Sequence, residues 1–175
     1  MPNQHSLMPS LFVATLSIGL AWPTFAATSN DAFALFDALC VSTNSDLALV
    51  ERMALAANAK PIPPEMLNLD QAMAEHGGKG FLITRGGAKY SVAVTRNRGC
   101  SVLAVGVLPV EIRKLLQTNY PLGKPTQDSS GTQNITLWPI VAPSRYRGGV
   151  IMLNVPKPGF GVDDALSIGF VPRSQ

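Results

Sequence analysis

The sequence predicts an α+β domain in which N-terminal helices pack on a mostly antiparallel sheet of about six strands. Apolar residues recur at helical spacing through the first half of the chain and alternate with polar residues through the second half. Turns that contain glycine divide the second half into short segments of the length of strands. Helices that precede a run of closely spaced strands are typical of an α+β fold.

The helical half begins near Asn30, which can cap a helix that continues to about residue 41. Thr43 and Asp46 have the spacing of a capping box, which predicts a second helix. A cluster of prolines after residue 60 ends that helix, and a short third helix is expected over residues 65–75.

Six segments of the second half have the alternation or the apolar content of strands, with one helix at residues 110–119 between the third and the fourth. The expected order is β-β-β-α-β-β-β, with one face of the sheet covered by helices and the other exposed to solvent. Pro139 lies inside the fourth strand and indicates an edge or bulged position. The predicted strands are residues 79–84, 88–96, 100–107, 133–141, 149–155 and 165–171.

Length and composition fit one globular domain after a short leader. The chain has 175 residues, of which 46% are hydrophobic and 14% are charged, so a disordered chain is excluded. Two cysteines are too few for a four-thiolate zinc site. The single predicted α+β domain covers residues 27–175.

The N-terminus has the pattern of a signal peptide. Leu11–Trp22 is almost entirely apolar but is shorter than the roughly 20 residues that a membrane-spanning helix needs. Thr24-Phe25-Ala26 places small residues before a cleavage site, so residues 1–26 are predicted to be removed after Ala26. The alternative is a buried N-terminal helix. Cleavage predicts a periplasmic or secreted protein with no remaining membrane span.

Cys40 and Cys100 are the only cysteines, and an oxidising compartment favours a disulfide between them. Such a bond would close about 60 residues and stabilise the fold by roughly 4 kcal/mol. Buried free thiols and a catalytic cysteine are the alternatives.

Two short motifs add a resemblance. Phe36 and Cys40 form a Phe-x-x-x-Cys helix after the leader, and Gly99-Cys100-Ser101-Val102 forms a later Gly-Cys-x-Val strand. This arrangement resembles a group of small exported proteins of proteobacteria whose activity is unknown. The resemblance implies a Gram-negative periplasm and no particular reaction.

Candidate catalytic chemistry centres on His76, the single histidine after residue 26. His76-Gly77-Gly78-Lys79-Gly80 is superficially similar to the oxyanion segment of esterases, but that segment belongs to a larger parallel fold. No Gly-x-Ser-x-Gly elbow accompanies it, and a helix end is the favoured interpretation of His76. No spacing of His, Cys, Asp or Glu predicts a metal site, and no cofactor is expected.

Basic side chains gather at the predicted hairpin ends. Guanidinium groups bind phosphate and carboxylate through two hydrogen bonds, so these residues form a candidate anion or partner surface. The alternative is that they are solvated and protect strand edges from aggregation. Successive hairpins lie at opposite ends of a sheet, so the residues are not all expected to share one site. The candidates are Arg85, Lys89, Arg96, Arg98, Arg145, Tyr146 and Arg147.

These observations predict a non-catalytic binding or interaction module, such as an inhibitor or an envelope accessory protein. Its expected partner is an envelope protein or an anionic envelope component. A net charge of +3 is too small to favour nucleic acid. The alternative function is a small periplasmic hydrolase that uses carboxylates or His76.

Overall fold

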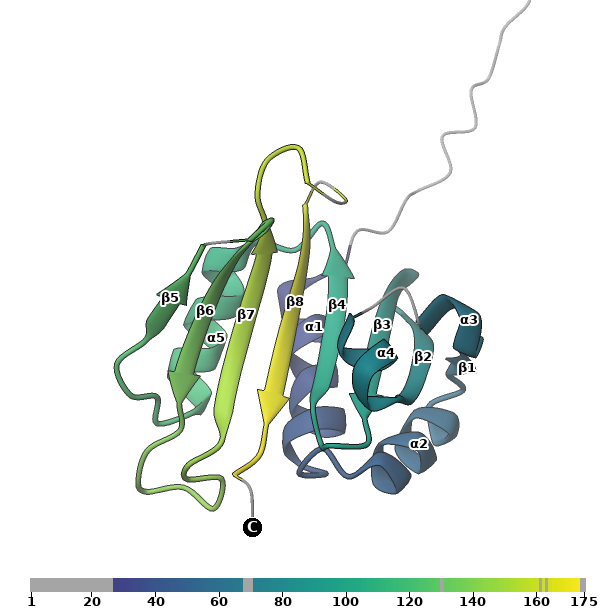
Figure 1. Cartoon of the computed structure of the whole chain (residues 1–175), viewed down its shortest axis with the longest axis horizontal. Coiled ribbons are helices and arrows are strands. Elements are labelled where there is room, and N and C mark those ends of the chain that lie inside the picture. Colours follow the sequence, from purple (N-terminus) through teal and green to yellow (C-terminus); the bar gives the residue numbers. More distant parts are fainter. Residues whose placement is uncertain (1–26, 68–70, 130, 161, 163, 174–175) are drawn as a thin grey trace, which may run out of the picture.

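The structure is a computed structural model that describes residues 27–67, 71–129, 131–160, 162 and 164–173. The predicted signal peptide, residues 1–26, lies outside these described residues. The predicted fold class is confirmed, because helices pack on one antiparallel sheet (Figure 1).

The sheet has the strand order β1-β2-β3-β4-β8-β7-β6-β5, and every neighbouring pair is antiparallel. The C-terminal strand β8 inserts between β4 and β7, so the two predicted three-strand units join into one sheet. The strands are β1 (Lys60–Pro61), β2 (Gly78–Arg85), β3 (Ala88–Thr95), β4 (Cys100–Val105), β5 (Thr126–Asp128), β6 (Gln133–Pro139), β7 (Val150–Pro156) and β8 (Ala165–Val171).

The expected number of about six strands is wrong, because the sheet has eight. The two additional strands, β1 and β5, are edge strands of two and three residues. Strands this short have no alternation to detect, and their pairing partners define them. Since β5 pairs with β6, the strand that contains Pro139 is not at the edge, and Pro139 is its last residue.

Two helical segments follow directly from the start of the described chain. The helix α1 (Ser29–Phe36) continues into a π-helix, η1 (Asp37–Val41), and α2 (Leu47–Ala56) follows. The side chain of Thr28 caps α1 and that of Asp46 caps α2, so the predicted caps Asn30 and Thr43 are wrong. Each cap accepts a hydrogen bond from the backbone N–H three residues later, in the first turn.

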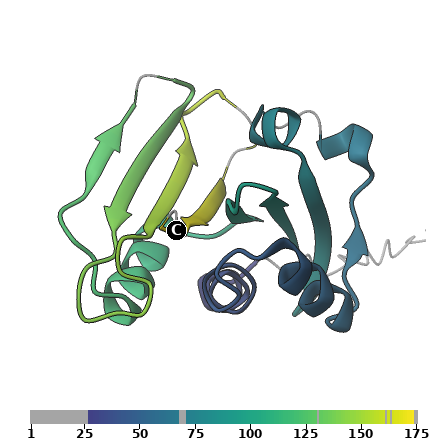
Figure 2. The same ribbon diagram turned by 60° about the horizontal axis from the view of Figure 1, so that its bottom comes forward.

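Helices lie on both faces of the sheet. Figure 2 shows α1, α2 and α5 (Pro109–Asn119) on one side of the curved sheet and α4 (Gln71–His76) on the other. The single helix predicted over residues 65–75 is instead two short helices, α3 (Pro64–Leu67) and α4. A Cβ on Gly80 would lie 2.4 Å from Leu67, so α3 packs closely on β2. The face expected to be solvated is therefore covered over β2 and β3.

The main core lies between the sheet and the helices α1, η1, α2 and α5. Alternate residues of the central strands point into it, as their burial pattern shows. Phe36 on α1 and Ile112 on α5 are fully buried against these strands. The core fixes the ends of the strands, where the candidate site residues lie.

Candidate functional site

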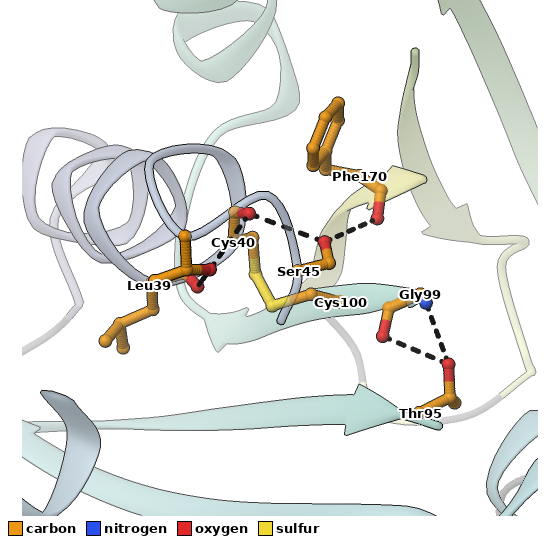
Figure 3. The surroundings of a disulfide bond; sticks show 8 residues. Leu39, Cys40, Ser45, Thr95, Gly99, Cys100 and Phe170 are labelled. Atoms are coloured by element: carbon orange, nitrogen blue, oxygen red, sulfur yellow. Dashed lines mark hydrogen bonds between the residues drawn. A yellow bond between two sulfur atoms is a disulfide. The ribbon is translucent and has the colours of Figure 1, made fainter. Parts of the chain in front are cut away.

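A disulfide joins Cys40 near the end of η1 to Cys100, the first residue of β4 (Figure 3). Their Cα atoms are 5.3 Å apart, and both residues are buried. The predicted pairing is confirmed, and the alternatives of free thiols and a catalytic cysteine are wrong. The bond fixes the loop after η1 at one end of the sheet.

Ser45 attaches this loop to the last core residue of β8. The Ser45 hydroxyl lies 3.4 Å from the carbonyl oxygen of Cys40 and 3.3 Å from that of Phe170, so it donates a bifurcated hydrogen bond to both oxygens (Figure 3). Asn44 and Ser45 both have left-handed backbones, with φ of 55° and 52°. This turn places Asn44 beside the end of β8.

Five arginines lie at the end of the sheet where β3, β6 and β8 finish and β4 and β7 begin. The register shows this directly, because Cys100 pairs with Phe170 and Phe170 pairs with Ile151. We call this region the basic end of the sheet. Its arginines come from the β3–β4 turn, the β6–β7 connection and the segment after β8, and are Arg96, Arg98, Arg145, Arg147 and Arg173.

The candidate residues Arg85 and Lys89 lie at the opposite end, because Arg85 pairs with Ala88 in the β2–β3 hairpin. The guanidinium of Arg85 binds Asp31 on α1 at 2.7 Å, so this arginine has an internal partner. The structure therefore separates these two residues from the other five candidates, as the alternation of hairpins predicts.

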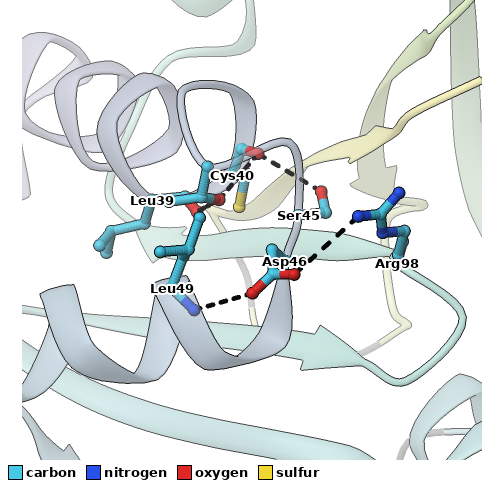
Figure 4. Close-up of polar contacts among 7 residues, drawn as sticks. Leu39, Cys40, Ser45, Asp46, Leu49 and Arg98 are labelled. Carbon is cyan, nitrogen blue, oxygen red and sulfur yellow. Dashed lines mark hydrogen bonds and ion pairs between the residues drawn. The ribbon is translucent and has the colours of Figure 1, made fainter.

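Arg98 also has a carboxylate partner. Its guanidinium lies 3.9 Å from Asp46, whose other oxygen accepts the hydrogen bond from the N–H of Leu49 (Figure 4). Arg96 is exposed and lies over Gly77, because a Cβ there would be 3.5 Å from its Nε. Arg98 thus supports the start of α2 and is less available to a ligand.

The remaining three arginines of the basic end line one cavity of about 360 Å³. We call it the arginine pocket. Arg145 and Arg147 come from the β6–β7 connection, and Arg173 follows β8. Within the described part of the chain, no ion pair joins any of the three to a carboxylate. The lining residues are Asn44, Arg145, Tyr146, Arg147, Phe170, Pro172 and Arg173.

Aromatic packing orients the pocket wall. The guanidinium carbon of Arg145 lies 4.6 Å from the ring centroid of Tyr146, which is a cation–π arrangement. The Tyr146 ring meets Phe170 edge-on, with centroids 6.0 Å apart. A Cβ on Gly149 would lie 2.7 Å from the Phe170 ring, so glycine permits this contact. Phe170 in turn is held by the Ser45 loop.

Asn44 and Arg173 were not among the candidates predicted from the sequence. Arg173 lies two residues after the end of the last strand, and Asn44 lies in the polar Ser42–Ser45 segment. Neither position has a pattern that marks a ligand. They join the pocket only because β8 lies between β4 and β7.

His76 and the carboxylates lie elsewhere. The His76 side chain is 44% exposed, and its nearest carboxylate partner is the adjacent Glu75 at 3.9 Å. Two other cavities, of about 430 and 650 Å³, contain Asp164 and Glu111 respectively as their acidic residues. Among the described residues, no three His, Cys, Asp or Glu side chains form a group that could hold a metal ion.

A partly buried hydrogen bond between the C-cap of α5 and η1 was also not predicted. The Tyr120 hydroxyl donates to Asp37 Oδ1. Burial, followed by this bond and the nearby carboxylate charge, raises the pKa of Tyr120 far above its ordinary value. Tyr120 therefore stays neutral at physiological pH and ties the helices together behind the basic end.

No protein-family model, curated protein or solved structure matches this chain. In the parts of the chain that the structure describes, no helix is long and apolar enough to cross a membrane. The function is therefore inferred from the chain's own residues.

Proposed function

We propose that the chain is an exported, non-catalytic binding module, such as an inhibitor or an envelope accessory protein, and that the arginine pocket is its site for an anionic group. The observation that carries this proposal is the convergence of Arg145, Arg147 and Arg173 on one cavity without carboxylate partners among the described residues.

The electrostatics of this pocket favour a bound anion. Like charges repel, so three guanidinium groups around one cavity raise the energy of the empty protein. An anion removes that repulsion and accepts charge-assisted hydrogen bonds, which are about twice as strong as neutral ones. The three side chains are exposed, so a ligand from solvent can reach them.

Export is supported by the leader pattern and the disulfide. Leu11–Trp22 is apolar and Thr24-Phe25-Ala26 fits a cleavage site. The only two cysteines are paired with each other, which fits an oxidising compartment.

Cleavage after Ala26 is tested by the intact mass of the protein isolated from the periplasm of a Gram-negative expression host. The expected mass begins at Ala27, and the thiols react with an alkylating reagent only after reduction. A control with Ala26 replaced by Arg should retain the leader, because cleavage sites need small residues. A mass that begins at Met1, or a thiol that is alkylated without reduction, would contradict export.

Anion binding is tested by thermal unfolding with inorganic phosphate, sulfate, acetate or citrate at constant ionic strength. An anion at 100 times its Kd should stabilise the protein by about 2.7 kcal/mol. The variant with Arg145, Arg147 and Arg173 all replaced by Gln should lose this stabilisation, because its pocket has no fixed cation.

The matched control replaces Arg52, Lys89 and Arg113 by Gln. These residues are exposed and lie outside the pocket lining, and the change in net charge is the same. This control should retain the stabilisation. Equal stabilisation of the two triple variants, or no stabilisation of the wild type by any of the four anions, would contradict the proposed site.

A further inference from the structure

We infer, resting on the proposed function, that the arginine pocket binds the terminal phosphoryl group of a phosphate monoester. The ligand class follows from the number of cations, the geometry of their donors and the apolar lining beside them. Each of these features comes from residues that the structure describes.

The charge of the pocket matches a dianion better than a carboxylate. Three guanidinium groups line it, and Arg98 with its partner Asp46 adds little net charge nearby. One carboxylate has two oxygens and a single charge, which a single guanidinium fork already satisfies. A phosphate monoester has three terminal oxygens and a charge of about −1.5 to −2 at pH 7. It can therefore give each of the three arginines an oxygen and offset most of their repulsion.

The donor geometry is partly fixed before the ligand arrives. Stacking on the Tyr146 ring holds the plane of the Arg145 guanidinium, which leaves its N–H edge available for a fork to two oxygens. Asn44 lines the same cavity and carries an amide that can donate to an oxygen. Its position is fixed by the disulfide and by the bonds of Ser45 to Cys40 and Phe170.

The cavity has an apolar part beside its cations. Tyr146, which is partly exposed, lines it together with Phe170 and Pro172, which are buried, and its volume is about 360 Å³. The accessible aromatic surface of Tyr146 suits the organic part of an ester. This favours a monoester over free inorganic phosphate as the tighter ligand.

Calorimetric titration with three ligands that share one ring tests the class directly. Phenyl phosphate has two charges and three terminal oxygens, phenyl sulfate has one charge and three oxygens, and benzoate has one charge and two oxygens. Phenyl phosphate should bind at least tenfold more tightly than either of the others, because phenyl sulfate lacks its second charge and benzoate lacks both the second charge and the third oxygen. Benzoate or phenyl sulfate binding as tightly as phenyl phosphate would overturn the inference.

Two triple variants separate fork geometry from charge. Replacing Arg145, Arg147 and Arg173 by Lys keeps the net charge and removes the planar forks, and should weaken phenyl phosphate binding at least tenfold. Replacing all three by Gln should weaken it at least a hundredfold. An unchanged Kd in the Lys variant would show that positive charge alone binds the ligand and that the planar guanidinium forks are not needed. This result would overturn the inference. Thermal unfolding of each variant, compared with wild type, confirms that it is folded.

The same phosphoryl chemistry occurs in soluble esters and in the headgroup of phosphatidic acid. Sedimentation with vesicles that contain phosphatidic acid, with and without competing phenyl phosphate, distinguishes these sources. Competed sedimentation supports a lipid headgroup, and calorimetric binding without sedimentation supports a soluble ester. If the anion of the earlier panel binds in the pocket but phenyl phosphate shows no preference, the phosphoryl inference fails and the proposed anion site remains. If no anion binds in the pocket, both fail.

Discussion

Replacing Cys40 and Cys100 together by Ala is expected to lower the free energy of unfolding by about 4 kcal/mol. The disulfide closes a loop with a sequence separation of 60 residues, so its removal increases the conformational entropy of the unfolded chain. It also releases η1 from the start of β4, at the end of the sheet that carries the arginine pocket. Urea unfolding of the chain from Ala27 onward, followed through the fluorescence of buried Trp138, measures the change.

Reduced wild-type protein is the control for this experiment, because it lacks the bond but keeps the sulfur atoms. It should lose a similar free energy. Alanine is the replacement because both cysteines are buried, and a serine hydroxyl there would add the cost of an unpaired polar group. A loss below about 1 kcal/mol in both proteins would contradict the loop-closure account.

The central strands could be predicted from the sequence because each carries its own local signal. In β3, for example, Tyr90, Val92 and Val94 are buried, while Lys89, the residue before the first of these, is exposed. Such alternation is a property of the strand itself. The edge strands β1 and β5 have no such pattern, and only their neighbours define them.

The helix caps could not be predicted because the sequence offers competing residues. The segment from Ser42 to Asp46 contains five polar residues, each of a type that caps helices. Tertiary contacts select among them. Ser45 is buried against Phe170 and Thr43 bonds to the carbonyl of Leu39, which leaves Asp46 to begin α2.

Only part of the arginine pocket could be predicted from the sequence. Arg145, Tyr146 and Arg147 were predicted from their turn, because basic and glycine residues there suit an anion. Their grouping with Asn44 and Arg173 depends on the strand order, which places three separate connections at one end of the sheet. Local patterns carry no information on strand order, so the complete pocket required the structure.

Replacing Phe36 by Ala is expected to lower the free energy of unfolding by about 3–5 kcal/mol. The Phe36 ring is fully buried and meets Tyr120 edge-on, with centroids 6.5 Å apart. It therefore fills the space between α1, α5 and the sheet, and alanine would leave a cavity there. The measurement is urea unfolding, again followed through Trp138.

Phe33→Ala is the matched control, because Phe33 lies on the same helix and also contacts the Tyr120 ring, at 6.1 Å between centroids. Phe33 is only partly buried, so less of its surface loses contacts and the expected loss is smaller than for Phe36. Equal losses in the two variants would contradict the assignment of Phe36 to the core. A larger loss for Phe36 would support its place in the core between α1, α5 and the sheet, one helical turn before the disulfide of Cys40.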